Sequence, residues 1–486
     1  MKRNIYSYIL VLAAVLGLAH TAAAQTLNVN VGNVTYAYSA AQVGDVTCAG
    51  ANQLTILGRT YSVADITDMV VTAGSVADNT VRVDYGSTGA HVTVAGNIAS
   101  HLTVTATAAD VSVVADASLA NEVTYTLSGT SADGSFYMDG EMKSTVVLNN
   151  LHLTSRSGGA VTIDNGKRIA VRLVGDNVLA DAAGGSQKAC MFVNGHVEMT
   201  GQGSLTITGN ARHGYFSDEY TVLKADCGSL TVSAAKNDGL HVNEYFRMDG
   251  GTVSVTCEGD GLDVGKKLKG SEYDGQVIIN GGSLTLSSTG DAGKGIKAEG
   301  DITIAGGTIA VTVSGKAYYD TEKQDVTSSS AMKTDGNFNM TSGNLSLMAT
   351  GMGSKGLNVT GDISVSGGSL TVVTTGSVYK YDSANDSKPN AVKADGSITL
   401  SGGDVRVAAS PSKGTAFKSD ADFVINGGTV MGIGGKASVP DSSSAKAFNT
   451  FTGQSVKGGT TFTLGGVSFD IPAAYSNPSA YVVVAK

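Results

Sequence analysis

The chain has 486 residues, of which 64 are glycine, 5 are proline and none is tryptophan. Its formal net charge is −9, and an acidic surface argues against nucleic acid or an anionic membrane as the main partner. Only 15% of the residues are charged, which is too few for a disordered chain, and Val, Thr, Ser and Gly are abundant. This composition predicts a folded all-β protein.

The first 24 residues have the order of an export signal. Lys2 and Arg3 give a positive start, residues 9–19 form an apolar run, and a run of three alanines follows. This order predicts a signal peptide over residues 1–24 that is cleaved before Gln25. The apolar run is shorter than the roughly 20 residues that a bilayer span requires. We therefore expect no membrane insertion and a location in the periplasm, at the cell surface or outside the cell.

The mature chain is expected to have three parts. Residues 25–144 are rich in apolar alternation but show no longer period, so they predict a separate β-rich N-terminal segment. Residues 145–435 carry a repeat. Residues 436–486 hold a Ser-rich stretch and a terminal Tyr-Val-Val-Val strand, which suit a C-terminal β cap. Caps at both ends would cover strand edges that otherwise invite aggregation.

The repeat is a paired glycine followed by alternating apolar residues. Examples are Gly250-Gly-Thr-Val-Ser-Val, Gly306-Gly-Thr-Ile-Ala-Val and Gly367-Gly-Ser-Leu-Thr-Val. The paired-glycine positions begin at residues 202, 227, 250, 281, 306, 342, 367, 402 and 427. The basic interval is therefore about 25 residues, with insertions in three longer gaps.

A repeat of this length, built from short strands and glycine corners, predicts a right-handed parallel β-helix. One turn cannot bury its inward side chains alone, so the turns stack and share a core. A propeller blade needs roughly 40 to 45 residues, which excludes the main rival architecture. We expect about ten turns over residues 145–435.

The chain has four cysteines: Cys48, Cys190, Cys227 and Cys257. Four in so long a chain do not form a disulfide framework, and the sequence leaves three pairings open. Cys257 continues the alternation of Val253 and Val255, which favours a buried core residue over a disulfide.

Aligning the turns brings one outward position into register. Its members are Phe192, Phe216, His241, Asp263, Lys297, Lys333, Asn358, Lys393 and Lys418. This row changes from aromatic through mixed polar to largely basic. It is either a solvated face with lysines that keep the surface soluble, or a strip of ammonium groups that meets a polymer carrying repeated carboxylates. The second interpretation makes the members from His241 onward candidates for carbohydrate binding, apart from Asp263.

Two long insertions, residues 316–330 and 377–389, leave the same corner on alternate turns. Long loops on a solenoid usually mark its binding face. Tyr319 and Tyr381 stand in these loops beside aspartates and could stack on sugar rings.

Aspartates gather at the corners of neighbouring turns. Asp238 and Asp260 each precede the glycine that starts a turn, and Asp263 and Asp291 lie nearby. Oxygen ligands at adjacent corners could hold calcium, which accepts six to eight oxygens. The alternative is ordinary turn chemistry, because Asn-Asp-Gly is a common turn sequence.

The sequence gives little support for catalysis. Glycoside hydrolysis needs two carboxylates at a defined separation, and no pair stands apart from the repeats. Arg212-His213-Gly214 is weakly similar to the Gly-His-Gly of polygalacturonases, but the other motifs of that family are missing. A non-catalytic role is therefore favoured.

With its repeat laid out, the chain resembles the secreted carbohydrate-binding β-helix proteins first described from a cellulose-degrading clostridium. The resemblance covers roughly residues 125–435. It rests on Tyr125-Thr-Leu-Ser-Gly-Thr, Val146-Val-Leu-Asn-Asn-Leu, Gly203-Ser-Leu-Thr-Ile-Thr, Asn237-Asp-Gly-Leu and Gly259-Asp-Gly-Leu. It implies binding of acidic plant polysaccharide of the polygalacturonate type, and calcium. The first 100 mature residues look similar to the N-termini of secreted proteins from gut Bacteroidetes.

The chain departs from this family pattern in its later turns. The acidic corner becomes Ser329-Ser-Ala-Met, Ser354-Lys-Gly-Leu and Lys413-Gly-Thr-Ala. Calcium implied by the resemblance is therefore limited to the corners near Asp238, Asp260 and Asp291. We also expect the lysines of the row to be less neutralised than in the family.

Our leading hypothesis is a secreted, non-catalytic protein that binds an acidic polysaccharide with the help of calcium. The alternative is a structural or adhesive surface protein in which the solenoid is a spacer. A polysaccharide lyase or glycoside hydrolase is a third class, and it would reveal itself by shortening the polymer.

Overall fold

The computed structural model describes residues 25–43, 46–49, 52–267 and 272–486. Nearly every element in these ranges is a β-strand; the exception is a short 3₁₀ helix, η1 (Gly96–His101). The all-β class predicted from composition is therefore confirmed. Within the described ranges, no helix has the length and apolar character to cross a bilayer. The signal peptide predicted over residues 1–24 lies outside the described residues.

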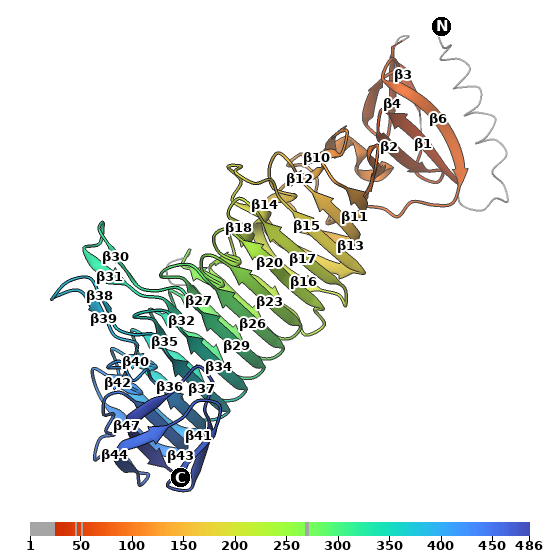
Figure 1. The fold of residues 1–486 in the computed structure, drawn as a ribbon. Helices are drawn as coiled ribbons and strands as arrows, with labels where there is room; N and C mark the ends of the chain where they lie inside the picture. Colours follow the sequence, from red (N-terminus) through yellow and green to blue (C-terminus); the bar gives the residue numbers. More distant parts are fainter. Residues whose placement is uncertain (1–24, 44–45, 50–51, 268–271) are drawn as a thin grey trace. The chain divides into compact units, whose positions relative to one another are not determined.

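The chain divides into two compact units. The first consists of residues 1–182 and 191–203, and the second of residues 183–190 and 204–486. Each unit contains ladders of parallel strands (Figure 1). The parallel β-helix predicted from the glycine repeat is thus the architecture of the protein.

The first unit begins with antiparallel strands. They are β1 (Gln25–Val31), β2 (Val34–Ser39), β3 (Thr47–Ala49), β4 (Gln53–Ile56), β5 (Arg59–Ser62) and β6 (Ile66–Ala73). β1 pairs with β2 and β6, whereas β3, β4 and β5 form a small sheet of their own. The guanidinium of Arg59 lies 3.9 Å from the ring centroid of Tyr36, so a cation–π contact joins β5 to β2.

The following strands of the first unit introduce parallel pairing. They are β7 (Thr80–Gly86), β8 (Gly89–Ala95), β9 (Leu102–Thr107), β10 (Asp110–Ala115), β11 (Val123–Ser131), β12 (Ser135–Asp139), β13 (Ser144–Thr154), β14 (Val161–Val174), β15 (Asp176–Ala180) and β16 (Ala189–Thr200). The ladder β7–β11–β13–β14 is parallel, as is the ladder β10–β12–β14.

Parallel pairing therefore includes residues before 145, within the segment that the sequence analysis set apart. The buried side chains of Val81, Tyr125, Val146 and Val171 follow one another in register along the first of these ladders. Apolar stacking holds these turns together without paired glycines, so the glycine repeat does not mark where the ladder starts.

The second unit is a three-sided parallel β-helix (Figure 1). Its first face consists of β18 (His213–Ser217), β21 (Leu240–Asn243), β24 (Leu262–Gly265), β27 (Lys294–Ala298), β32 (Ser330–Thr334), β35 (Lys355–Val359), β40 (Val392–Ala394) and β42 (Phe417–Ser419). Its second face consists of β19 (Thr221–Leu223), β22 (Tyr245–Met248), β25 (Gln276–Ile279), β28 (Ile302–Ile304), β33 (Phe338–Met340), β36 (Ile363–Val365) and the first parts of β41 (Ile398–Ala408) and β43 (Phe423–Gly434). Its third face consists of β17 (Ser204–Gly209), β20 (Ser229–Ala235), β23 (Thr252–Cys257), β26 (Ser283–Ser288), β29 (Thr308–Val313), β34 (Asn344–Ala349), β37 (Ser369–Thr374) and the second parts of β41 and β43.

The paired glycines form the corner between the second and third faces. The second glycine of seven successive corners, from Gly251 to Gly428, has φ between 75° and 85°. A Cβ atom on Gly307 would lie 2.9 Å from the carbonyl oxygen of Gly282 in the preceding turn. Both the backbone conformation and the close approach of adjacent turns therefore require glycine. The corner role predicted for the glycine pairs is confirmed.

Apolar side chains that alternate along each strand fill the interior. Cys257 belongs to this core, with 2% of its surface exposed, and burial raises the pKa of its thiol to about 12. The core position predicted for this residue is therefore confirmed.

The last strands of the second unit are antiparallel. They are β44 (Asn449–Val456), β45 (Thr461–Leu464), β46 (Val467–Asp470) and β47 (Asn477–Ala485). β47 pairs with β43, and a cluster including Met431, Phe469 and Tyr475 packs beside it. The last turn of the helix therefore has a hydrogen-bonding partner along its edge. Two further strand pairs, β30 (Tyr318–Asp320) with β31 (Asp325–Thr327) and β38 (Tyr379–Lys380) with β39 (Asp386–Ser387), build the two insertions.

Candidate functional site

The first face of the second unit carries one outward residue per turn. Strand register places these residues opposite one another in the order Phe216, His241, Asp263, Lys297, Lys333, Asn358, Lys393 and Lys418. We call these eight residues the outward row. Their neighbours along each strand, such as Ile296 and Ala298 beside Lys297, are buried in the core. The alignment of turns made from sequence is confirmed for these eight residues. Phe192 lies in the first unit, opposite Thr162.

Each lysine of the outward row has a carboxylate partner. The pairs are Lys297–Asp263 (2.9 Å), Lys333–Asp335 (3.0 Å), Lys393–Asp395 and Lys418–Asp420. In the last three pairs the aspartate follows the lysine by two residues, which is the spacing of neighbours on one side of a strand. The lysines of the row are therefore neutralised by carboxylates of this chain. The basic half of the row is a column of ion pairs.

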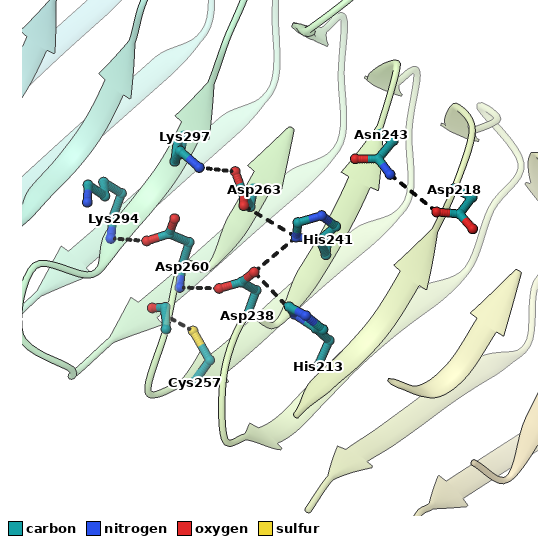
Figure 2. Close-up of polar contacts among 11 residues, drawn as sticks. His213, Asp218, Asp238, His241, Asn243, Cys257, Asp260, Asp263, Lys294 and Lys297 are labelled. Atoms are coloured by element: carbon teal, nitrogen blue, oxygen red, sulfur yellow. Dashed lines mark hydrogen bonds and ion pairs between the residues drawn. The ribbon is translucent and has the colours of Figure 1, made fainter. Parts of the chain in front are cut away.

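A cluster of histidines and aspartates lies at the other end of the row (Figure 2). It consists of the row members His241 and Asp263 together with His213 and Asp238, which do not belong to the row. Oδ2 of Asp238 lies 3.1 Å from Nδ1 of His213 and 3.0 Å from Nδ1 of His241. The same nitrogen of His241 lies 3.3 Å from Oδ2 of Asp263. His213 is 3% exposed and Asp238 is 6% exposed, so both side chains are held within the protein.

Burial and charge act against each other in this cluster. Burial alone would lower the pKa of His241, but Asp238 and Asp263 raise it to about 9. Burial alone would raise the pKa of Asp238, yet the imidazoles of His213 and His241 hold it well below its usual range. The carboxyl of Asp263 is shifted downward in the same way by His241 and Lys297. The cluster is therefore strongly coupled electrostatically.

The carboxylates predicted to hold calcium do not form an oxygen cage. Asp260 accepts a hydrogen bond from the backbone N–H of Lys294 at 2.7 Å, and burial raises its pKa to about 6. Asp291 is exposed and contacts Lys316. Among the described residues, no three of Asp238, Asp260, Asp263 and Asp291 bring ligand oxygens within 4.8 Å of one another. Because calcium takes six to eight oxygens, these four carboxylates alone do not supply its ligand shell in this arrangement.

The two insertions contact each other through tyrosines. The rings of Tyr319 and Tyr381 stack with centroids 4.0 Å apart, and the backbone N–H of Tyr319 donates to the hydroxyl of Tyr379 at 3.2 Å. Tyr381 is 55% exposed. The loops therefore present one supported aromatic face to solvent, and such a face is able to stack on a sugar ring.

Lys355 lies beneath the same pair of loops. Its ammonium donates hydrogen bonds to the hydroxyls of Ser328 at 2.9 Å and Ser387 at 2.8 Å, one from each insertion. Burial and repulsion from Lys393 lower the pKa of Lys355 to about 8. This lysine joins the two loops to the turn below them.

The outward row ends beside a shallow hollow. The hollow has a volume of about 370 Å³, and its lining includes Asn390, Phe417, Lys418 and Phe423. Phe417 and Phe423 stack at 4.8 Å between ring centroids. The row therefore leads to a second aromatic pair at the last turns of the helix.

Sequence reasoning missed the roles of His213 and Lys355. A signal for His213 was present, because the corner Asp238 follows it by 25 residues, one repeat. The Lys-x-Asp spacing at Lys333, Lys393 and Lys418 was likewise readable. Nothing in the sequence marks Lys355 as buried, since its environment is made by two distant loops.

Comparison with known proteins found one solved structure, one relative and one family model that are similar to this chain. A solved structure of the polysaccharide lyase-like protein from C. thermocellum, in a gadolinium derivative, has 22% sequence identity and a TM-score of 0.43, over 55% of this chain and 100% of that chain. A carbohydrate-binding domain-containing protein of Acetivibrio thermocellus is 28% identical over 197 residues, which cover 32% of this chain and 68% of the relative. The family described as carbohydrate-binding domain-containing protein matches residues 110–376 and 333–438. Since these matches include more than half of the 486 residues, the chain belongs to the family of carbohydrate-binding domain-containing proteins.

Proposed function

We propose that the mature chain is an exported, non-catalytic protein that binds a polysaccharide along the outward row. The observation that carries this proposal is the register of the row, which repeats one outward polar side chain at every turn from His241 to Lys418. Adjacent parallel strands are about 4.8 Å apart, so the row is a straight, periodic surface. A periodic surface suits a polymer better than a compact ligand.

The ligand we favour is an acidic polysaccharide that contains uronate residues. Four of the last five row members are lysines. The partner aspartates of Lys333, Lys393 and Lys418 are near half exposed, whereas Asp263, the partner of Lys297, is largely buried. Ion pairs at such a surface contribute only about 0–1 kcal/mol, so a polymer carboxylate can replace an aspartate as the partner of an ammonium. Calcium would lie only between the protein and the polymer, where it would bridge exposed aspartates of the protein and carboxylates of the polymer.

The exposed aromatic pair supports the same surface. Tyr319 and Tyr381 belong to loops that are tied to the turn carrying Asn358 through Lys355. A sugar ring stacked on Tyr381 would add an apolar contact to the polar contacts of the row. This contact is independent of ligand charge.

A neutral polysaccharide is the second candidate, and the ion pairs favour it. A column of alternating ammonium and carboxylate groups offers both donors and acceptors, which suits hydroxyl groups. A structural or adhesive role is left if neither polymer binds. Catalysis is not part of the proposal, because the family description names binding.

The test is retention of the purified mature chain on immobilised polygalacturonate and on a neutral glucan. Each is measured with calcium, with a calcium-selective chelator and with added salt, while the length of the polymer is followed. An acidic ligand predicts retention on polygalacturonate alone, weakened by salt. Shortening of the polymer would overturn the non-catalytic role, and no retention on either polymer would overturn binding.

Substitutions of single lysines test whether the outward row is the binding surface. Lys297→Ala, Lys333→Ala and Lys393→Ala should each weaken retention by about fivefold, the equivalent of roughly 1 kcal/mol. Lys457→Ala is the matched control, because Lys457 is an exposed lysine between β44 and β45 and lies outside the row. Equal effects of the control and the row variants would mean that charge, and not the row, governs retention.

A further inference from the structure

We propose that His213, Asp238 and His241 form a site for a divalent transition-metal ion of the zinc class, which links two successive turns of the β-helix. His213 is on β18, His241 is on the adjacent strand β21, and Asp238 lies at the corner that leads into β21. The ion would therefore join neighbouring turns through side chains, in addition to the backbone ladder. This inference concerns a metal site and does not depend on which polysaccharide is bound.

The three ligand atoms already have a suitable spacing. In a tetrahedral zinc site with bonds of about 2.0–2.1 Å, neighbouring ligand atoms are about 3.3 Å apart. Oδ2 of Asp238 is 3.1 Å from Nδ1 of His213 and 3.0 Å from Nδ1 of His241. All three ligand atoms lie within 4.8 Å of one another. Small side-chain rotations would open these distances around an ion.

The buried state of His213 is the second observation. Its side chain is 3% exposed, and among the described residues its Nδ1 atom has no partner with hydrogen-bond geometry, although it is aimed at Asp238 (Figure 2). A buried polar atom without a hydrogen bond is rare and calls for an explanation. Coordination of an ion through the Nδ1 lone pair would give this atom a well-directed interaction in place of its poorly aligned contact with Asp238.

The surroundings hold the ligands in place. Oδ1 of Asp238 accepts the backbone N–H of Asp260 at 2.9 Å, which leaves Oδ2 directed at the two imidazoles. The ring of Phe216 stacks on that of His241 at 4.5 Å, with 18° between the planes. Support of this kind orients ligands around a metal and fixes the ring positions.

The donor set selects the class of ion. Two imidazole nitrogens and one carboxylate oxygen suit zinc, copper, nickel or cobalt, whereas calcium and magnesium prefer oxygen donors. His241 is about one-fifth exposed, so an ion can reach the cluster from solvent. We therefore expect the site to bind zinc but not calcium when the two ions are supplied at the same concentration.

The experiment titrates the tag-free mature chain with Zn²⁺, Co²⁺ and Ca²⁺ by calorimetry, and follows Co²⁺ by its visible absorption. His213→Gln and Asp238→Asn should each remove one equivalent of Zn²⁺ or lower its affinity by at least about 100-fold, because loss of a ligand costs at least as much as loss of a supporting group. His152→Gln is the control, since His152 is a half-exposed histidine outside the cluster. Excess Ca²⁺ should not displace the ion.

Zinc should also raise the unfolding temperature of the wild-type chain and of His152→Gln, but not of the cluster variants. If a cluster variant fails to fold, X-ray absorption spectroscopy of the wild-type zinc complex identifies the ligands of the ion, and about two imidazole ligands are expected. The proposal is overturned if zinc binds no more tightly than calcium, if the absorption shows no imidazole ligands, or if folded cluster variants keep the full zinc affinity.

Discussion

Tyr319 and Tyr381 stack face to face, with ring centroids 4.0 Å apart and ring planes 3° from parallel. The two residues stand in different insertions, so neither loop alone can form the platform. Tyr319 is the inner ring, because its backbone N–H is bonded to the hydroxyl of Tyr379, whereas Tyr381 is more than half exposed. A ligand that stacks on this platform therefore meets Tyr381.

We predict that Tyr381→Ala weakens polysaccharide retention by about five- to tenfold, because loss of a stacking partner costs roughly 1 kcal/mol or more. Binding to the immobilised polymer measures the effect. Tyr273→Ala is a matched control, since Tyr273 is also an exposed tyrosine but stands in another part of the second unit. Unchanged retention in Tyr381→Ala would remove the loops from the binding surface.

Lys355 gives a prediction on pH. Its pKa in the folded protein is about 8, below the 10.5 of an ordinary lysine, because burial and Lys393 disfavour its charge. Between these two pH values the unfolded chain binds more protons than the folded protein, so this lysine makes the protein more stable as pH rises. Its unfavourable contribution is fully present below about pH 8 and amounts to at most about 3 kcal/mol.

Lys355→Met should therefore differ from the wild type in a pH-dependent way. The variant loses two hydrogen bonds to serine hydroxyls, a constant loss of about 1 kcal/mol each. It also loses the charge penalty, so its stability relative to wild type should be greatest at pH 7 and should fall by pH 10. Urea unfolding at both pH values measures this change. A stability difference that is the same at both would contradict the lowered pKa.

The glycine corners predict a local destabilisation. Gly307→Ala places a Cβ atom 2.9 Å from the carbonyl oxygen of Gly282 at a residue with φ of 81°, and should cost about 1–3 kcal/mol. Chemical denaturation measures the loss. Gly158→Ala is the control, because a Cβ there meets nothing within 4 Å and its φ is not positive, so it should change stability little. Similar values for both variants would show that the corner tolerates side chains.

The β-helix and its outward row could be predicted from the sequence because both follow from the regular interval of the glycine repeat. Glycine at a corner and alternation along a strand fix which side chains point outward, so Lys297 and Lys333 could be aligned without coordinates. The two-residue spacing of Lys333 and Asp335 also indicates their ion pair, which alignment between turns does not show.

Other features could not be predicted, because side-chain packing determines them. The sequence makes Asp238 either a candidate calcium ligand or an ordinary turn residue, whereas its rotamer turns Oδ2 toward two imidazoles and Oδ1 toward a backbone N–H. The glycine repeat also does not reach the turns around Tyr125, where apolar stacking replaces the paired glycine, so periodicity alone could not place them in the parallel ladder. The spacing of one repeat brings His213 near Asp238, but spacing does not determine side-chain rotamers or show apolar stacking where the glycine pair is missing.

The ion pair of Lys393 with Asp395 separates the two ligand classes. For an acidic polymer, Lys393→Ala should weaken binding, whereas Asp395→Asn should strengthen it by about two- to fivefold, because the ammonium is released and a repelling carboxylate is removed. For a neutral polymer, both groups contact hydroxyls and both changes should weaken binding. Retention of both variants on polygalacturonate and on the neutral glucan shows whether each substitution weakens or strengthens binding.

Weaker binding of Asp395→Asn to polygalacturonate at low calcium would contradict a direct ammonium–uronate contact. The same loss found only when calcium is present would instead assign the aspartate to a calcium bridge.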